Sequence, residues 1–201
     1  MEYYHDLITE KSFKILQDLK REFDFILIGG WAIFLYTKSL KSKDIDIIVD
    51  YDELEKFKKE FDIVKNERLK KYEAKVEQID IDIYLPYYSN IGLRVEEIKK
   101  YTQSIEGFNV PMPEVLLILK TYTFFQRRNT TKGRKDLIDI FSLLSKEIIN
   151  WQEYKELIKK YNLEEINKKL KELISSTKNL PELNLLNHQL SRLKRKILEN
   201  L

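Results

Sequence analysis

The segment from Ile26 to Asp50 constrains the fold of this chain more than any other part of the sequence. It begins with an apolar run that ends at Gly29 and Gly30, two residues that tolerate positive φ and close approach of the backbone. A short helical pattern follows, and then the sequence DIDIIVD at residues 44–50 starts with alternating acidic and apolar side chains. Such alternation is typical of a strand with one buried face. The segment therefore predicts a strand, a glycine turn, a helix and a second strand.

The second predicted strand carries two carboxylates on one face. Its alternation places two sets of side chains on opposite faces: Ser42, Asp44 and Asp46 against Ile45, Ile47 and Val49. Neighbouring carboxylates repel each other, and a divalent cation that prefers oxygen ligands, above all Mg²⁺, offsets this repulsion. The glycine turn before a helix N-terminus leaves backbone N–H groups that can hold phosphate oxygens. Together these features indicate phosphoryl or nucleotidyl transfer; the alternative interpretation is a solvated face of an antiparallel sheet.

Two glycines, a short helix and an Asp-x-Asp strand, in this order, resemble the polymerase-beta-like nucleotidyltransferase superfamily. Many members have serine after the glycines, where this chain has Trp31. The resemblance implies an NTP substrate and a Mg²⁺ or Mn²⁺ cofactor. It also implies a set of site residues: Asp44 and Asp46 as catalytic metal ligands, and Gly29, Gly30, Ser42 and Lys43 in the nucleotide site.

A second stretch of acidic and apolar residues, 72–85, is similar in kind to the first. Taken as one regular strand, it has Asp80 and Asp82 on one face and its isoleucines on the other. If it lies beside the first acidic strand, three or four carboxylates converge, enough for two metal ions. In the superfamily a third carboxylate on a neighbouring strand completes the site. Asp82 resembles it best, because Pro86 follows shortly after, as in several relatives that modify tRNA; Asp80 is the competing candidate.

From Pro113 the chain is predicted to be helical to its end. The first of these helices is heavily apolar, so Lys120 is costly to bury unless its ammonium meets an anion. A polar loop follows, and we expect Asp136 to begin the next helix. Lys120, Arg127 and the Lys-Asp-x-x-Asp sequence at residues 135–139 resemble a pattern in the abortive-infection (AbiEii-type) toxin branch. The resemblance implies that Lys120 and Arg127 bind nucleotide phosphates and that Asp136 orients the lysine or lies beside the site. A snorkelling lysine and an N-capping aspartate are the alternatives.

The composition is that of a globular chain, with 43% hydrophobic residues, 36 basic residues and 33 acidic residues. The lack of cysteine excludes disulfides and thiolate metal sites. We expect neither a membrane span nor a signal peptide, because the sequence has no long apolar run and no charged-then-apolar leader, and the default localisation is cytoplasmic. From Trp151 to Leu201 there are 11 basic and 7 acidic residues. This excess suits a polyanion such as tRNA, although a lysine-rich solvated helical face is an equal alternative.

These observations predict an α+β protein in two domains. Residues 1–110 would form a nucleotidyltransferase core with a mixed sheet flanked by helices, and residues 111–201 an α-helical domain that closes the nucleotide cleft. The expected reaction is Mg²⁺-dependent transfer of a nucleoside monophosphate from an NTP to an acceptor. The toxin-like resemblance implies an RNA acceptor, such as a tRNA 3′ end, and an antitoxin partner. Two alternatives stay open: a catalytically silent nucleotide-binding or partner-binding module of the same fold, and a small-molecule nucleotidyltransferase.

Overall fold

The structure is a computed structural model that describes residues 2–201, with side chains from Asp6 onward. The chain divides into two compact units, Met1–Met112 and Pro113–Leu201. We call them the N-terminal unit and the helical unit and describe each by itself.

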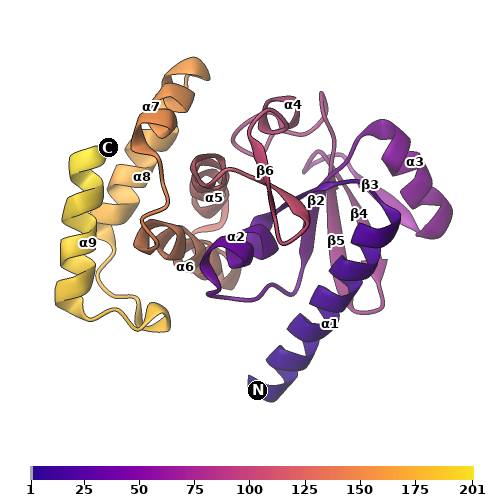
Figure 1. The fold of residues 1–201 in the computed structure, drawn as a ribbon, viewed down its shortest axis with the longest axis horizontal. Helices are drawn as coiled ribbons and strands as arrows, with labels where there is room; N and C mark the ends of the chain where they lie inside the picture. Colours follow the sequence, from indigo (N-terminus) through magenta and orange to yellow (C-terminus); the bar gives the residue numbers. More distant parts are fainter. Residues whose placement is uncertain (1) are drawn as a thin grey trace. The chain divides into compact units, whose positions relative to one another are not determined.

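Within the described residues, the N-terminal unit contains a seven-stranded mixed sheet (Figure 1). Its strands are β1 (Ile26–Ile28), β2 (Ile45–Ile48), β3 (Ile63–Asn66), β4 (Lys71–Val76), β5 (Ile79–Tyr84), β6 (Thr102–Ile105) and β7 (Phe108–Pro111). Their order across the sheet is β3-β4-β5-β2-β1-β7-β6. The central strand β2 runs antiparallel to β1 and parallel to β5. The two strands that carry the Asp-x-Asp patterns are therefore direct neighbours.

Helices of the N-terminal unit pack against this sheet and supply much of its core. They are α1 (Glu2–Glu22), α2 (Gly29–Thr37), α3 (Tyr51–Glu60) and α4 (Val95–Ile98). Trp31 of α2 is only 1% exposed, and its indole N–H donates to Ser12 Oγ of α1 at 2.9 Å. Trp31 thus joins two helices in the core.

Residues 72–85 form a hairpin, so the expectation of one regular strand is wrong. β4 and β5 are antiparallel neighbours, and they are joined at Glu77 and Gln78, where Glu77 has a φ of 55°. Two-residue hairpins usually carry Asn-Gly or Asp-Gly at the turn, and this turn has neither. Within β5 the expected faces are correct, because its isoleucines are buried and its acids are not.

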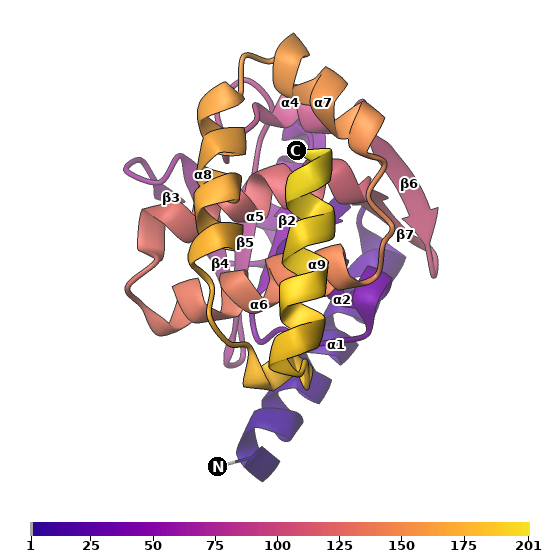
Figure 2. The ribbon, with the colours of Figure 1, turned by 90° about the vertical axis from the view of Figure 1, so that its left-hand side faces the viewer.

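The helical unit consists of α5 (Pro113–Arg127), α6 (Thr131–Ser145), α7 (Trp151–Lys160), α8 (Glu164–Ser176), a 3₁₀ turn η1 (Pro181–Leu183) and α9 (Asn187–Asn200). Helices α8 and α9 lie side by side (Figure 2). The expectation that Asp136 begins a helix is wrong, because α6 starts five residues earlier. Thr130 is its N-cap, and Thr130 Oγ1 accepts from the backbone N–H of Gly133 at 3.0 Å. Asp136 therefore lies inside the helix.

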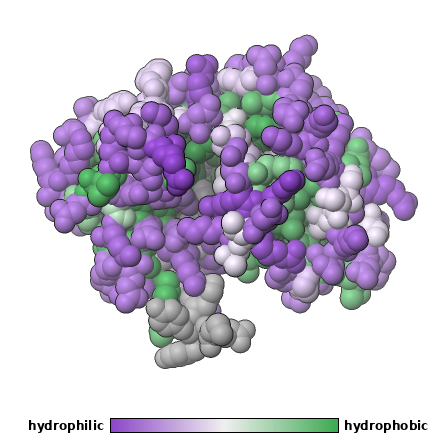
Figure 3. Space-filling view, turned by 180° about the vertical axis from the view of Figure 1, so that it is seen from behind, coloured by the Kyte–Doolittle hydropathy of each residue, from purple (hydrophilic) through white to green (hydrophobic). Residues whose placement is uncertain are grey.

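Hydrophilic residues dominate the surface seen in Figure 3. Among the described residues there is no helix with the length and apolar character needed to cross a membrane. The predicted α+β fold, with a mixed sheet, flanking helices and a helical C-terminal part, is confirmed.

Candidate active site

Asp46 and Asp82 lie directly opposite each other on adjacent parallel strands. In the β2–β5 register Asp46 pairs with Asp82, and isoleucine pairs flank them on both sides. Because the isoleucines are buried, the two carboxylates project from the other face of the sheet. The competing candidate, Asp80, is exposed and pairs with Lys75 at 3.6 Å near the hairpin turn. Of the two, it is therefore Asp82 that lies beside Asp46.

The diglycine turn lies against the carboxylate of Asp46. Ile28, the last residue of β1, pairs with Asp46, and Gly29 follows with a φ of 67°. A Cβ at Gly29 would lie 2.1 Å from Oδ2 of Asp46, so a larger residue cannot replace it without displacing that side chain. The N-cap of α2 is Ile28, which has no side-chain acceptor for the first N–H groups of the helix. Gly29 and Gly30 thus present a helix N-terminus next to an acid.

The remaining predicted residues of this region lie just before β2. Asp44 is the residue preceding the strand and is half-buried. Ser42 is buried, with 3% of its surface exposed, whereas Lys43 is exposed. Strand pairing therefore brings Asp46 and Asp82 together, and Gly29 lies beside them because it follows Ile28, the partner of Asp46. Asp44 lies two residues before Asp46, outside the strand.

Two residues that the sequence analysis did not single out extend this site. Glu73 lies opposite Asp82 in the β4–β5 register, so Glu73, Asp82 and Asp46 form a row across three neighbouring strands, which we call the acid row. Nζ of Lys71 lies 2.6 Å from Oδ2 of Asp82 and 2.8 Å from Oε1 of Glu73. Recognising the turn at residues 77 and 78 would have revealed this pairing, because a two-residue turn fixes the hairpin register.

The acid row perturbs the pKa values of its members. Burial, together with the charge of Asp46, raises the pKa of Asp82 to about 6, although Lys71 opposes the shift. Burial alone would lower the pKa of Lys71, but its bonds to Asp82 and Glu73 outweigh burial and raise it. The bond from Lys71 lowers the pKa of Glu73. Ionised Asp82 is therefore unfavourable here unless more positive charge is nearby.

The donor atoms of this site fit a divalent cation that prefers oxygen. Asp46 and Asp82 offer carboxylate oxygens on adjacent strands, and Asp44 immediately precedes β2. Within residues 2–201, no three His, Asp or Glu side chains form a preassembled metal cluster. Mg²⁺ is commonly held by one or two carboxylates, water and substrate phosphates instead of a complete protein cage. Two carboxylates of this kind would suffice for a metal that arrives with a nucleotide.

The helical unit brings Lys120, Arg127 and Asp136 together and adds Asp139. Nζ of Lys120 lies 3.0 Å from Oδ1 of Asp136 and 2.7 Å from Oδ2 of Asp139. Arg127 donates to both oxygens of Asp136, from Nε at 2.7 Å and from Nη2 at 3.0 Å. The side chain of Lys120 is 9% exposed and that of Arg127 is 37% exposed. The anions that a buried lysine requires are thus present within the unit.

The two aspartates of this cluster have opposite pKa shifts. Burial would raise the pKa of Asp136, but Lys120 and Arg127 outweigh burial and lower it. At Asp139 burial exceeds the effect of Lys120, and the pKa is raised. Asp136 is consequently the firm anionic partner of both cations. The orienting role of Asp136 and the binding of phosphate by Lys120 and Arg127 stay predictions.

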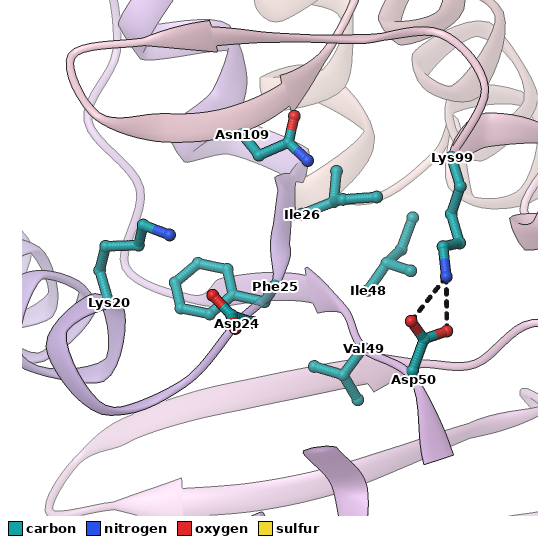
Figure 4. Close-up of a pocket in the computed structure, with 9 residues that line it drawn as sticks. All are labelled: Lys20, Asp24, Phe25, Ile26, Ile48, Val49, Asp50, Lys99 and Asn109. Carbon is teal, nitrogen blue, oxygen red and sulfur yellow. Dashed lines mark hydrogen bonds and ion pairs between the residues drawn. The ribbon is translucent and has the colours of Figure 1, made fainter. Parts of the chain in front are cut away.

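A cavity of about 230 Å³ lies in the N-terminal unit, away from the acid row (Figure 4). Its lining includes Ile26 of β1 and Ile48 of β2, which pair with each other. This pair lies two residues along the strands from the pair of Ile28 and Asp46. At its rim Lys99 donates to both oxygens of Asp50, at 2.5 and 2.7 Å. None of the predicted site residues lines this cavity.

The fold, a seven-stranded mixed sheet with flanking helices and further helices after it, is similar to that of solved structures described as nucleotidyltransferases. The chain is similar to a Helicobacter pylori protein named as a candidate nucleotidyltransferase, with 19% identity and a TM-score of 0.52 over 96% of this chain and 90% of that one. It is also similar to JHP933 from Helicobacter pylori, with 15% identity and a TM-score of 0.50 over 98% of this chain and 90% of that one.

A further similarity is to the Megavirus polyadenylate synthase, with 19% identity and a TM-score of 0.44. It covers 71% of this chain, which spans only 31% of that protein. No protein-family model matches the chain, and no curated protein does. At these identities the comparisons show the fold alone, and the AbiEii-type resemblance stays a prediction.

Proposed function

We propose that this chain transfers a nucleoside monophosphate from an NTP to an acceptor, with Mg²⁺ or Mn²⁺ held by Asp44, Asp46 and Asp82. The observation that carries the proposal is the pairing of Asp46 with Asp82 on adjacent parallel strands, beside a turn at Gly29 where any Cβ would displace the side chain of Asp46. Acidic side chains on a solvated sheet face would be largely exposed, whereas the side chain of Asp82 is only 22% exposed.

Each residue of the N-terminal site has a role in this proposal. Gly29 and Gly30 let backbone N–H groups approach phosphate oxygens at the start of α2. Ser42 and Lys43 offer a hydroxyl group and a cation to the nucleotide. Asp44, Asp46 and Asp82 would hold the metal ion, which when bound would supply positive charge beside the triphosphate and lower the pKa of the attacking hydroxyl.

In the helical unit, we assign phosphate binding first to Arg127 and then to Lys120. Arg127 is the more accessible of the two, at 37% against 9% exposed, and its planar guanidinium suits phosphate oxygens. Asp136 holds both cations in place.

The test is incorporation of a labelled NTP with and without Mg²⁺. Asp46→Asn and Asp82→Asn should each reduce metal-dependent incorporation by about a hundredfold or more, since a metal supplies several kcal/mol of charge stabilisation. Asp80→Asn is the matched control, because Asp80 is an exposed acid on the same strand as Asp82. Thermal melts would show that all three variants fold. Wild-type activity in Asp46→Asn would contradict the proposed role of the acids.

For the acceptor we propose RNA, in particular a tRNA 3′ end, and for the biological context a toxin that an antitoxin protein controls. The resemblance of the helical unit and the basic excess after Trp151 support this assignment. Induced expression should slow growth and lengthen a subset of tRNAs, and the Asp46→Asn variant should do neither. Unchanged tRNA lengths together with normal growth would argue against an RNA acceptor.

A catalytically silent nucleotide-binding module is the second candidate, and the position of Lys71 is the observation that favours it. The ammonium of Lys71 pairs with Asp82 and Glu73, so these two acids have a cationic partner without any metal. NTP binding that is insensitive to Mg²⁺ and is never followed by turnover would support this candidate over the enzyme.

A further inference from the structure

Lys71 brings a positive charge of the chain's own onto the carboxylate that we assign as the third metal ligand. Its Nζ lies between Oδ2 of Asp82 and Oε1 of Glu73, and its side chain is only 11% exposed. Glu73 is itself held in place, because Nδ2 of Asn66 donates to its Oε1 at 3.0 Å. The ammonium is therefore fixed by acids on two strands.

The neighbouring pair on the same hairpin shows how unusual this contact is. Lys75 pairs with Asp80 at 3.6 Å, with side chains 65% and 59% exposed. An exposed pair of this kind contributes little to stability. Lys71 and Lys75 are both on β4, but only Lys71 is buried against the acid row.

Repulsion among the carboxylates of the acid row accounts for the position of the Lys71 ammonium. Like charges directly opposite each other on neighbouring strands are destabilising, and the acid row places Glu73, Asp82 and Asp46 in register across three strands. The ammonium of Lys71 offsets part of that repulsion. A divalent cation that binds these carboxylates must therefore compete with Lys71 for the oxygens of Asp82.

We propose that Lys71 is a built-in counter-cation that occupies Asp82 in the metal-free protein, weakens the binding of free divalent metal and leaves Asp82 when metal binds. This inference rests on the proposed function, because it requires Asp46 and Asp82 to be metal ligands. Lys71 acts through Asp82 and is a positioning residue. Its consequence is that metal enters the site effectively only with a triphosphate, whose oxygens add ligands that Lys71 does not contest.

The experiment is a titration of the protein with Mn²⁺ alone at pH 8, with free Mn²⁺ followed by electron paramagnetic resonance. Lys71→Met should bind Mn²⁺ about tenfold more tightly or better, because it removes a full charge next to the ion. Lys71→Arg keeps that charge and should stay near wild type. Lys75→Met is the matched control, since it removes the same charge from the same strand, and it should also stay near wild type.

The outcomes separate this inference from the proposed function. Equal Mn²⁺ affinity in wild type, Lys71→Met and Lys75→Met overturns the counter-cation and leaves the metal site standing. If no variant binds Mn²⁺ at millimolar concentration and Asp46→Asn behaves as wild type does, the metal site fails and the counter-cation fails with it. Should Lys71→Met not fold, Lys71→Gln retains a hydrogen-bond donor for both acids and carries the same expectation.

Discussion

Replacing Asp82 with asparagine should remove a pH-dependent loss of folding stability. The pKa of Asp82 is raised from 3.8 to about 6, first by burial and then by the charge of Asp46. The folded state therefore holds this proton more tightly than the unfolded state does. The resulting stabilisation is fully present below pH 3.8 and is lost as the pH rises through about 6.

The size of the effect follows from the difference between the two pKa values of Asp82. A tenfold change in proton affinity corresponds to about 1.4 kcal/mol, so the rise in pKa from 3.8 to about 6 gives about 3 kcal/mol at most. The side chain of Asp82 is 22% exposed, so solvent reduces this figure only modestly. We expect the free energy of unfolding of the wild type, relative to Asp82→Asn, to fall by about 2–3 kcal/mol from pH 4 to pH 7.

The assay is urea unfolding of both proteins at several pH values in the presence of EDTA. The difference in free energy of unfolding between wild type and Asp82→Asn cancels the contributions of the titratable groups that the substitution does not affect. Asp80→Asn, at an exposed position of the same strand, should show no such dependence relative to wild type. A difference between wild type and Asp82→Asn that stays constant across this pH range would refute the reasoning, as would an ordinary pKa for Asp82 in a carboxyl NMR titration.

Three further substitutions test separate parts of the structure. Gly29→Ala should abolish nucleotide incorporation and lower the thermal midpoint, because its Cβ would meet Oδ2 of Asp46 at 2.1 Å. Gly107→Ala is the control, because Gly107 has a φ of 81° but lies in open space, and it should lower the free energy of unfolding by only about 1 kcal/mol. Equal effects of the two substitutions would contradict the contact with Asp46. Lys120→Met should lower the free energy of unfolding by about 3–5 kcal/mol, because it removes the ammonium paired with the buried carboxylate of Asp139. A loss below about 1 kcal/mol in urea would contradict this. Thr130→Ala should lower it by about 1 kcal/mol through loss of the α6 N-cap, and an unchanged urea midpoint would exclude the cap.

The sequence predicted the acid-bearing strands because period-two alternation determines which side chains share a face. It predicted Asp82 as the neighbour of Asp46 only through a resemblance, since nothing local distinguishes Asp82 from Asp80. Glu73 and Lys71 escaped notice for a different reason. Their meaning depends on the β4–β5 register, and that register is set by a turn whose residues, Glu and Gln, carry no strong turn signal.

In the helical unit, the chemistry was more predictable than the partners. The apolar character of α5 predicted that Lys120 must meet an anion, and Asp136 and Asp139 lie within ion-pair distance of it. Sequence alone could not tell whether that anion belongs to the chain or to a ligand. The start of α6 was missed because Thr130 caps it from within a run of polar residues, where several residues are equally plausible caps.

Both units contain a buried lysine between two acids, but the charge around them differs. The acid row contains three carboxylates, and Lys71 pairs with two of them, those of Asp82 and Glu73, so we expect the acid row to attract a divalent cation. In the helical unit Lys120 and Arg127 face two aspartates, and these four charges balance.

The balance predicts that Mn²⁺ binds to the N-terminal unit and not to the helical cluster. Asp46→Asn should therefore weaken Mn²⁺ binding, whereas Asp139→Asn should leave it unchanged, provided that circular dichroism shows both variants folded. Loss of Mn²⁺ binding in Asp139→Asn with retention in Asp46→Asn would reverse the assignment of the metal site, because the cation would then follow burial of an acid and not an excess of negative charge.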